Sequence, residues 1–261
     1  MSNAPHLQFV DFSGNALTST IPVDFFPIET NPFLEYIYLF SNQLEGTLSN
    51  NVGNMVHLID LLVHDNQFTG TLPSTLYQCT NLVSLFVQNN HFEGSPDLAF
   101  RNDAASFYQL QAIDFASNAF TGTIPSVLFY SPSLVYYSCS QNCFHGELPE
   151  GICSAITLQQ LYMEGVRSGE KCKTRIFGSL SEVYFSQAVP GTIPHCLWDM
   201  PVLQFLYLSG NLLEGTFPDD KERNVSSIRH IGKGTNDVCA AVAAVAAVAT
   251  ATAAADNVMI M

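Results

Sequence analysis

Residues 58–73 read LIDLLVHDNQFTGTLP and contain the pattern that decides the fold. Leu58, Leu61 and Val63 form the LxxLxL pattern of a short strand and are predicted to point into a core, while the residues between them face solvent. Asn66 then places its amide inside a sharp turn, where it can bond backbone groups that would otherwise be buried unpaired. Gly70 allows a tight backbone position, and Pro73 ends local pairing. Such a stretch predicts one coil of a repeating structure.

The same frame recurs along the chain at a nearly constant period. One more unit is hidden in the longest gap, where Val166 stands in place of asparagine and the frame closes late, at Gly191-Thr-Ile193-Pro194. We therefore count eight units, with an insertion in the seventh and a break in the asparagine row at Val166. One coil buries little alone, so stability must come from stacking. The asparagines, spaced by 27, 24, 24, 28, 24 and 69 residues, are Asn15, Asn42, Asn66, Asn90, Asn118, Asn142 and Asn211.

This pattern, LxxLxLxxNxLxGxIP at about 24 residues, resembles the leucine-rich repeat (LRR) of the plant-type subfamily over about residues 6–218. The resemblance implies an α/β-type solenoid, a right-handed superhelix of about eight repeats. One parallel β-sheet is expected on the concave side, and short 3-10 helices or loops on the convex side. The resemblance also implies that ligands bind on the concave sheet.

The repeat frame divides the chain into three parts. Residues 1–218 are expected to form the solenoid, with an insertion at about 167–190. Residues 219–239 are polar and are expected to form a linker. Residues 240–261 are a low-complexity tail rich in alanine and valine, too short and too weakly apolar to favour a membrane span.

The start of the chain lacks the usual features of a secretory or a capped protein. Its first six residues, Met-Ser-Asn-Ala-Pro-His, contain neither a basic nor an apolar segment, so no signal peptide is visible. The first predicted strand begins at about Leu7 without a polar cap ahead of it, although open solenoid ends need one. We therefore expect the chain to be a fragment of a longer protein.

The chain is acidic, with 23 acidic and 9 basic residues and a net charge of −14. Residues 1–166 hold 14 acidic residues against a single basic one, Arg101. Nucleic acids and anionic membranes need clustered lysine and arginine, so this composition argues against both as partners. The acidic part favours a neutral or basic partner by long-range steering, unless the acids serve only to keep an apolar surface soluble.

Alternate residues of the predicted strands form the concave face, and they include two aromatic groups, on units two to four and on units seven and eight. Exposed aromatic clusters mark partner surfaces, but aromatic residues also suit the surface of a parallel sheet, and the insertion could cover them. A polar rim is expected from Asp11, Asp60, His64, Asp114 and Glu164. The candidate partner-binding residues are Tyr36, Tyr38, Phe40, Leu62, His64, Phe86, Gln88, Asp114, Tyr162, Phe205 and Tyr207.

The chain has seven cysteines. Cys79 and Cys139 fall on core positions of the repeat and are expected to be buried thiols. Four others cluster around the insertion and can form two disulfides, with Cys172–Cys196 or Cys153–Cys172 as the pairings considered. Zinc is the weaker alternative, because no CxxC spacing exists. Disulfides would indicate an oxidising compartment. The four clustered cysteines are Cys143, Cys153, Cys172 and Cys196.

No catalytic, metal-binding or nucleotide-binding motif stands out, so we expect a protein that is not an enzyme and that needs no cofactor and no metal. The repeats resemble the LRR ectodomains of receptor-type kinases and the LRR surface antigens of protists. This resemblance implies a recognition module that binds a protein or glycan on its concave face, as a fragment of a larger cell-surface protein. Any contact with a membrane would come from a segment outside this chain.

Two alternative functions remain open from the sequence. The first is an ectodomain fragment of a receptor-type protein kinase that acts in signal transduction. The second is an inhibitor similar to the LRR inhibitors of polygalacturonase, although those carry paired cysteines in caps at both ends. An extracellular or cell-surface location is expected, with a cytoplasmic one as the alternative because no signal peptide is visible.

Overall fold

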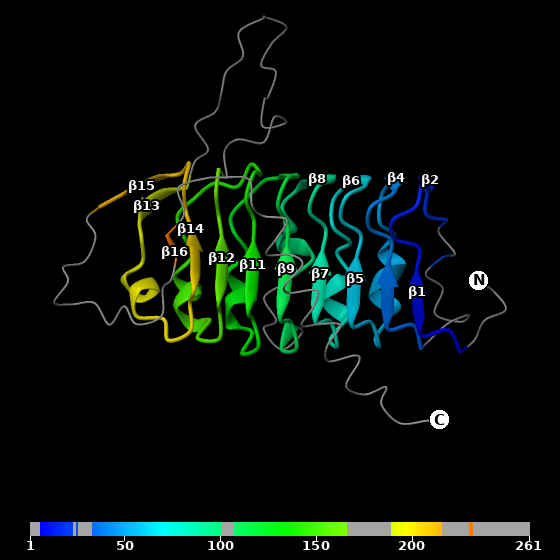
Figure 1. The fold of residues 1–261 in the computed structure, drawn as a ribbon, viewed down its shortest axis with the longest axis horizontal. Coiled ribbons are helices and arrows are strands. Elements are labelled where there is room, and N and C mark those ends of the chain that lie inside the picture. The colour runs from blue at the N-terminus through cyan, green and yellow to red at the C-terminus, as the bar shows by residue number, and fades with distance from the viewer. Residues whose placement is uncertain are drawn as a thin grey trace, which may run out of the picture.

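The computed structural model describes residues 6–22, 25, 33–100, 107–165, 189–215 and 230–231. In these residues the chain winds into a stack of coils, and each coil adds one strand to a parallel sheet (Figure 1). Consecutive coils lie side by side, as the LxxLxL pattern predicts. The fold is a leucine-rich-repeat solenoid.

The largest sheet has nine strands, which we call the concave sheet. Neighbouring strands within it run parallel and follow one another in chain order. The strands are β1 (Phe9–Asp11), β3 (Tyr36–Tyr38), β5 (Asp60–Leu62), β7 (Ser84–Phe86), β9 (Ala112–Asp114), β11 (Tyr136–Ser138), β12 (Gln160–Tyr162), β14 (Phe205–Tyr207) and β16 (His230–Ile231).

The structure adds a second parallel sheet to the single one that we expected. The Asn-x-Leu/Phe-x-Gly segments of the first five coils pair with one another, because each coil passes through an extended segment again after its turn. This sheet contains β2 (Thr18–Thr20), β4 (Gln43–Gly46), β6 (Gln67–Gly70), β8 (His91–Gly94) and β10 (Ala119–Phe120). A two-stranded sheet of β13 (Pro190–Thr192) and β15 (Leu212–Glu214) follows near the end of the described chain.

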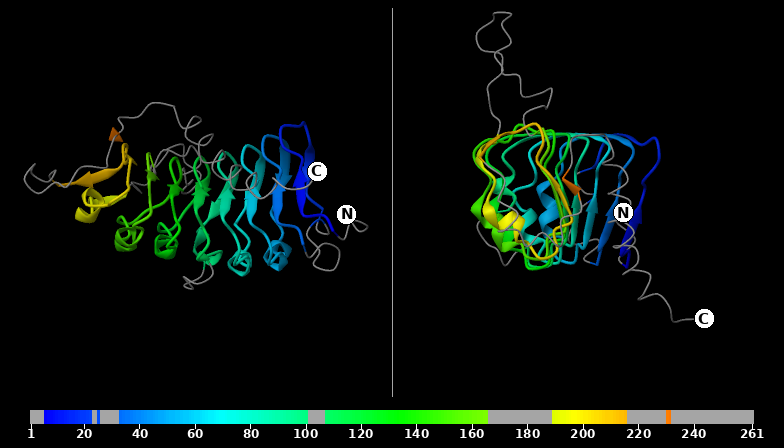
Figure 2. Two further views of the ribbon diagram at one scale, coloured as in Figure 1. Left: turned by 60° about the horizontal axis from the view of Figure 1, so that its bottom comes forward. Right: turned by 60° about the vertical axis from the view of Figure 1, so that its left-hand side comes forward.

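Short 3-10 helices complete the coils on the side away from the concave sheet, as the turned view in Figure 2 shows. Three of them follow a proline that ends the Gly-x-Ile/Leu-Pro motif and begins the helix. The helices are η2 (Asn50–Asn54), η3 (Leu76–Gln78), η4 (Pro96–Leu98), η6 (Ser126–Tyr130), η7 (Glu150–Ser154) and η8 (His195–Trp198).

The core runs the length of the stack between the sheets and the 3-10 helices. The central strand residues, such as Ile37, Leu61 and Leu85, point inward and are fully buried. A row of phenylalanines lies two residues after successive asparagines, with ring centroids 6.0, 6.0 and 6.2 Å apart in stacked pairs. This row consists of Phe68, Phe92, Phe120 and Phe144.

The asparagine of each interior coil satisfies backbone groups in two coils at once. In Asn90, Nδ2 donates to the carbonyls of Val87 and Gln88 in its own turn, at 3.1 and 3.3 Å. The same amide donates to Val63 O of the preceding coil at 3.0 Å, while Oδ1 accepts from Phe68 N–H at 2.9 Å. The asparagine therefore stabilises its own turn and also links that turn by hydrogen bonds to the coil before it.

The residue before this asparagine adopts the left-handed backbone conformation, which the sequence analysis did not anticipate. Its φ lies between 53° and 55° in five successive coils, a conformation that costs free energy for residues other than glycine. Each such N–H donates to a carbonyl of the next coil, as Ser41 does to His64 O at 3.1 Å, so stacking offsets the cost. The five residues are Ser41, Asp65, Asn89, Ser117 and Gln141.

Glycine ends β4, β6 and β8, where both the backbone conformation and the packing favour it, whereas Ser19 holds the same position in the first coil with φ 73°. Gly70 has φ +74°, and a Cβ there would lie 2.9 Å from Cγ2 of Thr47 in the preceding coil. That separation is too short for two carbon atoms, so any larger residue would push the coils apart.

The asparagine row loses one of its contacts near the end of the stack. Asn211 Nδ2 donates to Met163 O at 2.6 Å and to Leu208 O at 3.0 Å. Its Oδ1 atom is buried and has no hydrogen-bond partner in the described part of the chain. The break that we predicted at Val166 concerns a residue outside the described ranges.

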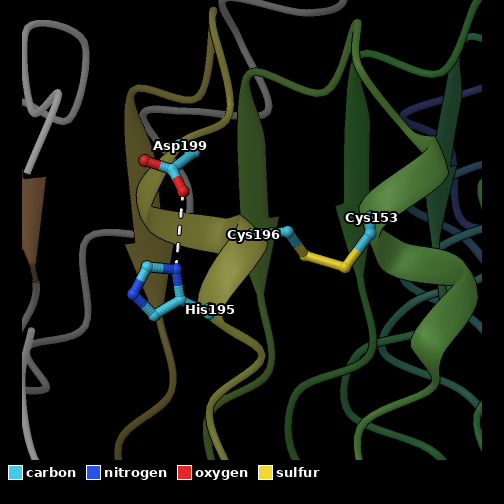
Figure 3. The surroundings of a disulfide bond; sticks show 4 residues. All are labelled: Cys153, His195, Cys196 and Asp199. Atoms are coloured by element: carbon cyan, nitrogen blue, oxygen red, sulfur yellow. Dashed lines mark ion pairs between the residues drawn. A yellow bond between two sulfur atoms is a disulfide. The ribbon is translucent and has the colours of Figure 1, made fainter. Parts of the chain in front are cut away.

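A disulfide joins Cys153 in η7 to Cys196 in η8, on neighbouring coils (Figure 3). This corrects both pairings that we considered, because each of them placed Cys172 in a bond with one of these two cysteines. The correct pair is 43 residues apart in sequence, but the coils bring the Cα atoms to 5.6 Å. Cys143 is also disulfide-bonded, and Cys172 lies outside the described residues.

Several predicted segments fall largely outside the described residues. These are most of the insertion at 167–190, the tail at 240–261 and most of the linker at 219–239. Within the linker range, however, His230–Ile231 forms β16, which pairs in parallel with β14 and adds a strand to the concave sheet.

We predict that Asn90→Ala lowers the free energy of unfolding by about 3 kcal/mol, because each buried backbone group left unpaired costs about 1–3 kcal/mol. Asn211→Ala is the matched control, because the Oδ1 atom that it removes has no hydrogen-bond partner among the described residues. Its expected cost is about half that of Asn90→Ala, since it frees two backbone carbonyls rather than three carbonyls and one N–H. Urea unfolding of both variants measures the difference, and equal losses would contradict the two-coil role of the asparagine.

A second prediction concerns the disulfide. The double variant Cys153→Ser/Cys196→Ser should lose about 3–4 kcal/mol of stability, since the bond closes a 43-residue segment of the unfolded chain. Thermal unfolding under oxidising conditions measures the loss. An unchanged melting temperature would show that the bond does not contribute.

Candidate functional site

The candidate site is the outward face of the concave sheet. The strands are three residues long and in register, so their first and third residues form two rows across the sheet, and the residue two positions further makes a third. All eleven candidate partner-binding residues lie in these three rows. The rows are thus a direct product of the constant position of each strand within its coil.

Aromatic side chains form a nearly continuous ladder along this face. At one end the ring of Phe9 lies 5.0 Å from Tyr38, and Tyr38 lies 6.2 Å from Phe40. Phe40 stacks on the imidazole of His64 at 4.6 Å, and His64 meets the edge of Phe86 at 6.0 Å. Aromatic rings at these separations attract one another beyond the effect of burial alone.

Tyr136 joins the two aromatic groups that the sequence analysis treated as separate. Its ring lies 6.2 Å from Phe86 and 5.6 Å from Tyr162, which in turn stacks on Tyr207 at 4.9 Å. We did not include Tyr136 among the candidate residues, although it occupies the first strand position of β11. Its register with Gln160 on β12 and Ala112 on β9 is the signal that identifies it.

The centre of this face is more buried than we expected. The sequence analysis placed these positions in solvent, but Phe86 is 3% exposed and Tyr136 is 1% exposed. Phe86, Ala112, Tyr136 and Tyr162 pack into a cluster of their own, separate from the main core. Leu62, Phe205 and Tyr207 are partly buried and pack against it. The rings of Phe86, Tyr136 and Tyr162 contact one another across neighbouring strands.

Asp60 and Tyr38 form a hydrogen-bonded pair at the first aromatic group. The Tyr38 hydroxyl donates to Asp60 Oδ2 at 2.9 Å. Burial and the nearby carboxylate raise the pKa of Tyr38 above its ordinary value. Burial also raises the pKa of Asp60, while the neighbouring hydroxyls of Ser84 and Tyr38 offset part of that rise. The Oδ1 atom of Asp60 is buried and has no hydrogen-bond partner in the described ranges.

Asp114 forms a second such pair, and both of its oxygens are satisfied. The Tyr136 hydroxyl donates to Oδ2 at 2.8 Å, and Ala116 N–H donates to Oδ1 at 2.8 Å. Asp114 is fully buried, and this burial raises its pKa from 3.8 to about 6. Asp114 therefore holds Tyr136 in place rather than presenting a free carboxylate.

His64 and Gln88 lie side by side just beyond β5 and β7. Burial lowers the pKa of His64 from 6.5 to about 4, so the imidazole is neutral at pH 7. Its Nε2 atom lies 3.9 Å from Asp65, while Nδ1 is buried without a hydrogen-bond partner among the described residues. Gln88 Oε1 is likewise buried without a hydrogen-bond partner among the described residues. These two atoms are available to a ligand that offers matching groups.

Further along the same row, Glu164 is bonded within the face. The Ser209 hydroxyl donates to Glu164 Oε1 at 2.7 Å, and the Ser140 hydroxyl accepts from Glu164 N–H at 2.9 Å. Asp11 lies at the other end, exposed, and accepts from the backbone and hydroxyl of Ser13. These contacts give the rim residues fixed positions.

The described residues contain little that points to chemistry. The free cysteines in these ranges are Cys79 and Cys139, and burial raises the pKa of each thiol, which makes them inert as nucleophiles. No group of three or more His, Cys, Asp or Glu side chains gathers there as metal ligands would. None of the helices in those ranges has the length and apolarity needed to cross a bilayer.

The buried carboxylate of Asp114 predicts a pH dependence of stability. Its native pKa is raised, so its favourable contribution is complete below pH 3.8 and is lost as the pH rises through about 6. We expect wild type to lose about 2 kcal/mol relative to Asp114→Asn between pH 4 and pH 7, since each pKa unit corresponds to about 1.4 kcal/mol. Urea unfolding at several pH values measures this difference.

The comparison must be made against the variant because His64 acts in the opposite direction. Its native pKa is lowered, so its contribution is present above pH 6.5 and is lost as the pH falls through about 4. Wild type alone can therefore show little net change. A constant difference between wild type and Asp114→Asn across this range would contradict the raised pKa.

Comparisons with known proteins agree with this architecture. The model of the Leucine Rich Repeat family matches residues 6–27 and 202–221. Receptor-like protein 18 of Arabidopsis thaliana is 33% identical over 115 residues, which are 42% of this chain and 13% of that protein. The chain thus spans only a small part of the length of this relative.

Two solved structures share the fold over most of the chain. The LRR ectodomain of the plant membrane receptor kinase GASSHO1/SCHENGEN3 from Arabidopsis thaliana, in complex with CASPARIAN STRIP INTEGRITY FACTOR 2, is 26% identical with a TM-score of 0.65. The match covers 80% of this chain and 22% of that one. The PEPR1–AtPEP1 complex is 25% identical with a TM-score of 0.62, over 87% and 31% of the two chains. The chain therefore shares the leucine-rich-repeat solenoid fold of plant receptor ectodomains and resembles them in sequence.

Proposed function

We propose that this chain is a non-catalytic recognition module that binds a peptide or protein partner on its concave sheet. The observation that carries the proposal is the aromatic ladder from Phe9 on β1 to Tyr207 on β14. Beside it lie buried polar atoms of Asp60, His64 and Gln88 that have no hydrogen-bond partner among the described residues. Tyrosine and phenylalanine supply large contact areas at a small entropy cost, and polar atoms among them fix orientation.

The similar receptors support a peptide rather than a glycan as the ligand. The GASSHO1/SCHENGEN3 ectodomain is in complex with CASPARIAN STRIP INTEGRITY FACTOR 2, and PEPR1 is in complex with AtPEP1. An extended peptide also suits the geometry, because the three residue rows run parallel to one another along the stack. LRR proteins of this kind provide a surface rather than a catalytic pocket.

We further propose that the module belongs to a larger cell-surface protein, in keeping with its partial coverage of Receptor-like protein 18. The Cys153–Cys196 disulfide supports an oxidising, extracellular environment, because such bonds persist there and are rare in the cytosol. An ectodomain of a receptor-type kinase is the second candidate, and the likeness to GASSHO1/SCHENGEN3 favours it.

Alanine variants of half-buried concave rings test the proposal. Phe40→Ala and Tyr207→Ala remove rings from opposite ends of the ladder. Binders are first selected from a library of random twelve-residue peptides and then titrated by fluorescence anisotropy. We expect each variant to weaken binding of the selected peptides about tenfold, the loss that is typical of truncating an aromatic anchor.

Tyr130→Ala is the matched control, because Tyr130 lies in η6 on the opposite side of the coils and is 52% exposed. It should leave the peptide affinity unchanged, and thermal unfolding should show that all three variants fold. Failure to select any binder, or equal affinities of wild type and both concave variants, would overturn the concave-face assignment.

A further inference from the structure

We infer that the bound peptide presents a cationic side chain, lysine or arginine, and that Asp60 on β5 is the carboxylate that receives it. This inference rests on the proposed function and names the chemistry of one contact within it. It concerns the end of the concave sheet formed by β3, β5 and β7.

The bonding of Asp60 is incomplete in the described structure. Its side chain is 4% exposed, and Oδ2 accepts from the Tyr38 hydroxyl at 2.9 Å. The neighbouring Ser84 hydroxyl also stabilises the charged carboxylate, while Oδ1 has no hydrogen-bond partner among the described residues. A buried carboxylate oxygen without a partner is costly, because it has lost its water without gaining a replacement. The unpartnered Oδ1 atom thus points to a group that arrives from outside.

The other carboxylates on this face do not share this feature. Asp114 accepts one hydrogen bond on each oxygen, and Glu164 accepts from Ser209. Neither has a carboxylate oxygen among the buried unpartnered atoms of the described residues. Asp60 is therefore the acid on this face whose own coils leave a buried acceptor unused.

No lysine or arginine in the described ranges can pair with the Asp60 carboxylate. All nine lysine and arginine residues of the chain lie outside the described ranges. The imidazole of His64, four residues after Asp60 on the same face, is neutral because its pKa is lowered to about 4. A cation is the natural partner for such a carboxylate, since charge-assisted hydrogen bonds are the strongest available to it.

The neighbours of Asp60 suit the stem as well as the head of a long basic side chain. Tyr36 is the register partner of Asp60 on β3, and Ser84 is its partner on β7. The rings of Tyr36 and Tyr38 provide surfaces that attract a cation and also pack against methylene groups. Ser84 presents only a small hydroxyl on the other side. An arginine or lysine can thus lie along the tyrosines and end at Asp60.

The field of the molecule acts in the same direction. The first 166 residues hold 14 acidic residues and one basic residue, so a basic peptide is drawn toward this face before contact. Gln88 Oε1, another buried and unpartnered acceptor, is available to the peptide backbone further along the sheet. The long-range attraction depends only on the total charge of the peptide. The contact with Asp60 requires a positive charge at one particular position of the peptide.

Positional-scanning peptide pools test the inference. The probes are twelve-residue pools with blocked termini, random except for one fixed residue, which is arginine, lysine, uncharged citrulline or norleucine. At one or two positions, the arginine and lysine pools should bind wild type about tenfold more tightly than the citrulline pool. In Asp60→Asn this preference should fall below about twofold, because the amide keeps its shape but loses the charge.

Two further variants make the result specific. Glu164→Gln removes the same charge from the same face and should keep the preference, since Glu164 is already bonded to Ser209. Asp60→Ser is a second uncharged variant with a smaller side chain, in case Asp60→Asn folds poorly. Circular dichroism should show that Asp60→Asn is at least as stable as wild type at pH 7, because a costly buried charge is gone.

The outcomes separate the two proposals. If wild type binds no pool, both the peptide-recognition function and the role of Asp60 are wrong. If wild type binds pools without preferring arginine or lysine over citrulline, or if the preference survives in Asp60→Asn and Asp60→Ser, only the role of Asp60 is wrong. Loss of the preference in Glu164→Gln as well would replace a specific contact with general attraction by the acidic face.

Discussion

The structure depends on one interaction, the asparagine amide that bonds the turn of its own coil and the backbone of the coil before it. Asn90 shows the arrangement, with carbonyls of both coils as acceptors and Phe68 N–H as donor. Because this contact repeats, every strand starts at the same point of its coil. The in-register rows of the concave sheet, and hence the aromatic ladder, follow from that constraint rather than from any attraction between the rings.

The concave sheet combines stabilising and unfinished contacts. Phe86, Tyr136 and Tyr162 bury one another, and Asp114 is fully bonded, so the middle of the face contributes to the fold. Asp60 retains a buried acceptor that the described coils do not use. Groups of this kind lower the stability of the free protein, and proteins commonly retain them at sites where a ligand completes the bonding.

The number of coils, the inward strand residues and the fold itself were predictable from the sequence, because the 24-residue period alone determines them. The candidate concave residues could be named for the same reason. The left-handed residues such as Ser41 were not predictable, because the strain is offset by a hydrogen bond to the next coil. The burial of Phe86 and the link through Tyr136 depend on how rings on different strands lean together. The Cys153–Cys196 pairing depends on contact between coils 43 residues apart.

The contacts between neighbouring coils near the end of the stack differ from those in the rest of the solenoid. Among the described residues, Asn211 Oδ1 has no counterpart of the contact that the other asparagines make to the coil before them. The disulfide joins η7 to η8 in the same region. A covalent bond thus reinforces the part of the array where the repeating polar contact is weakest. Because a solenoid is stabilised coil by coil, the disulfide ties the local unfolding of the coil that carries Cys196 to that of the coil that carries Cys153.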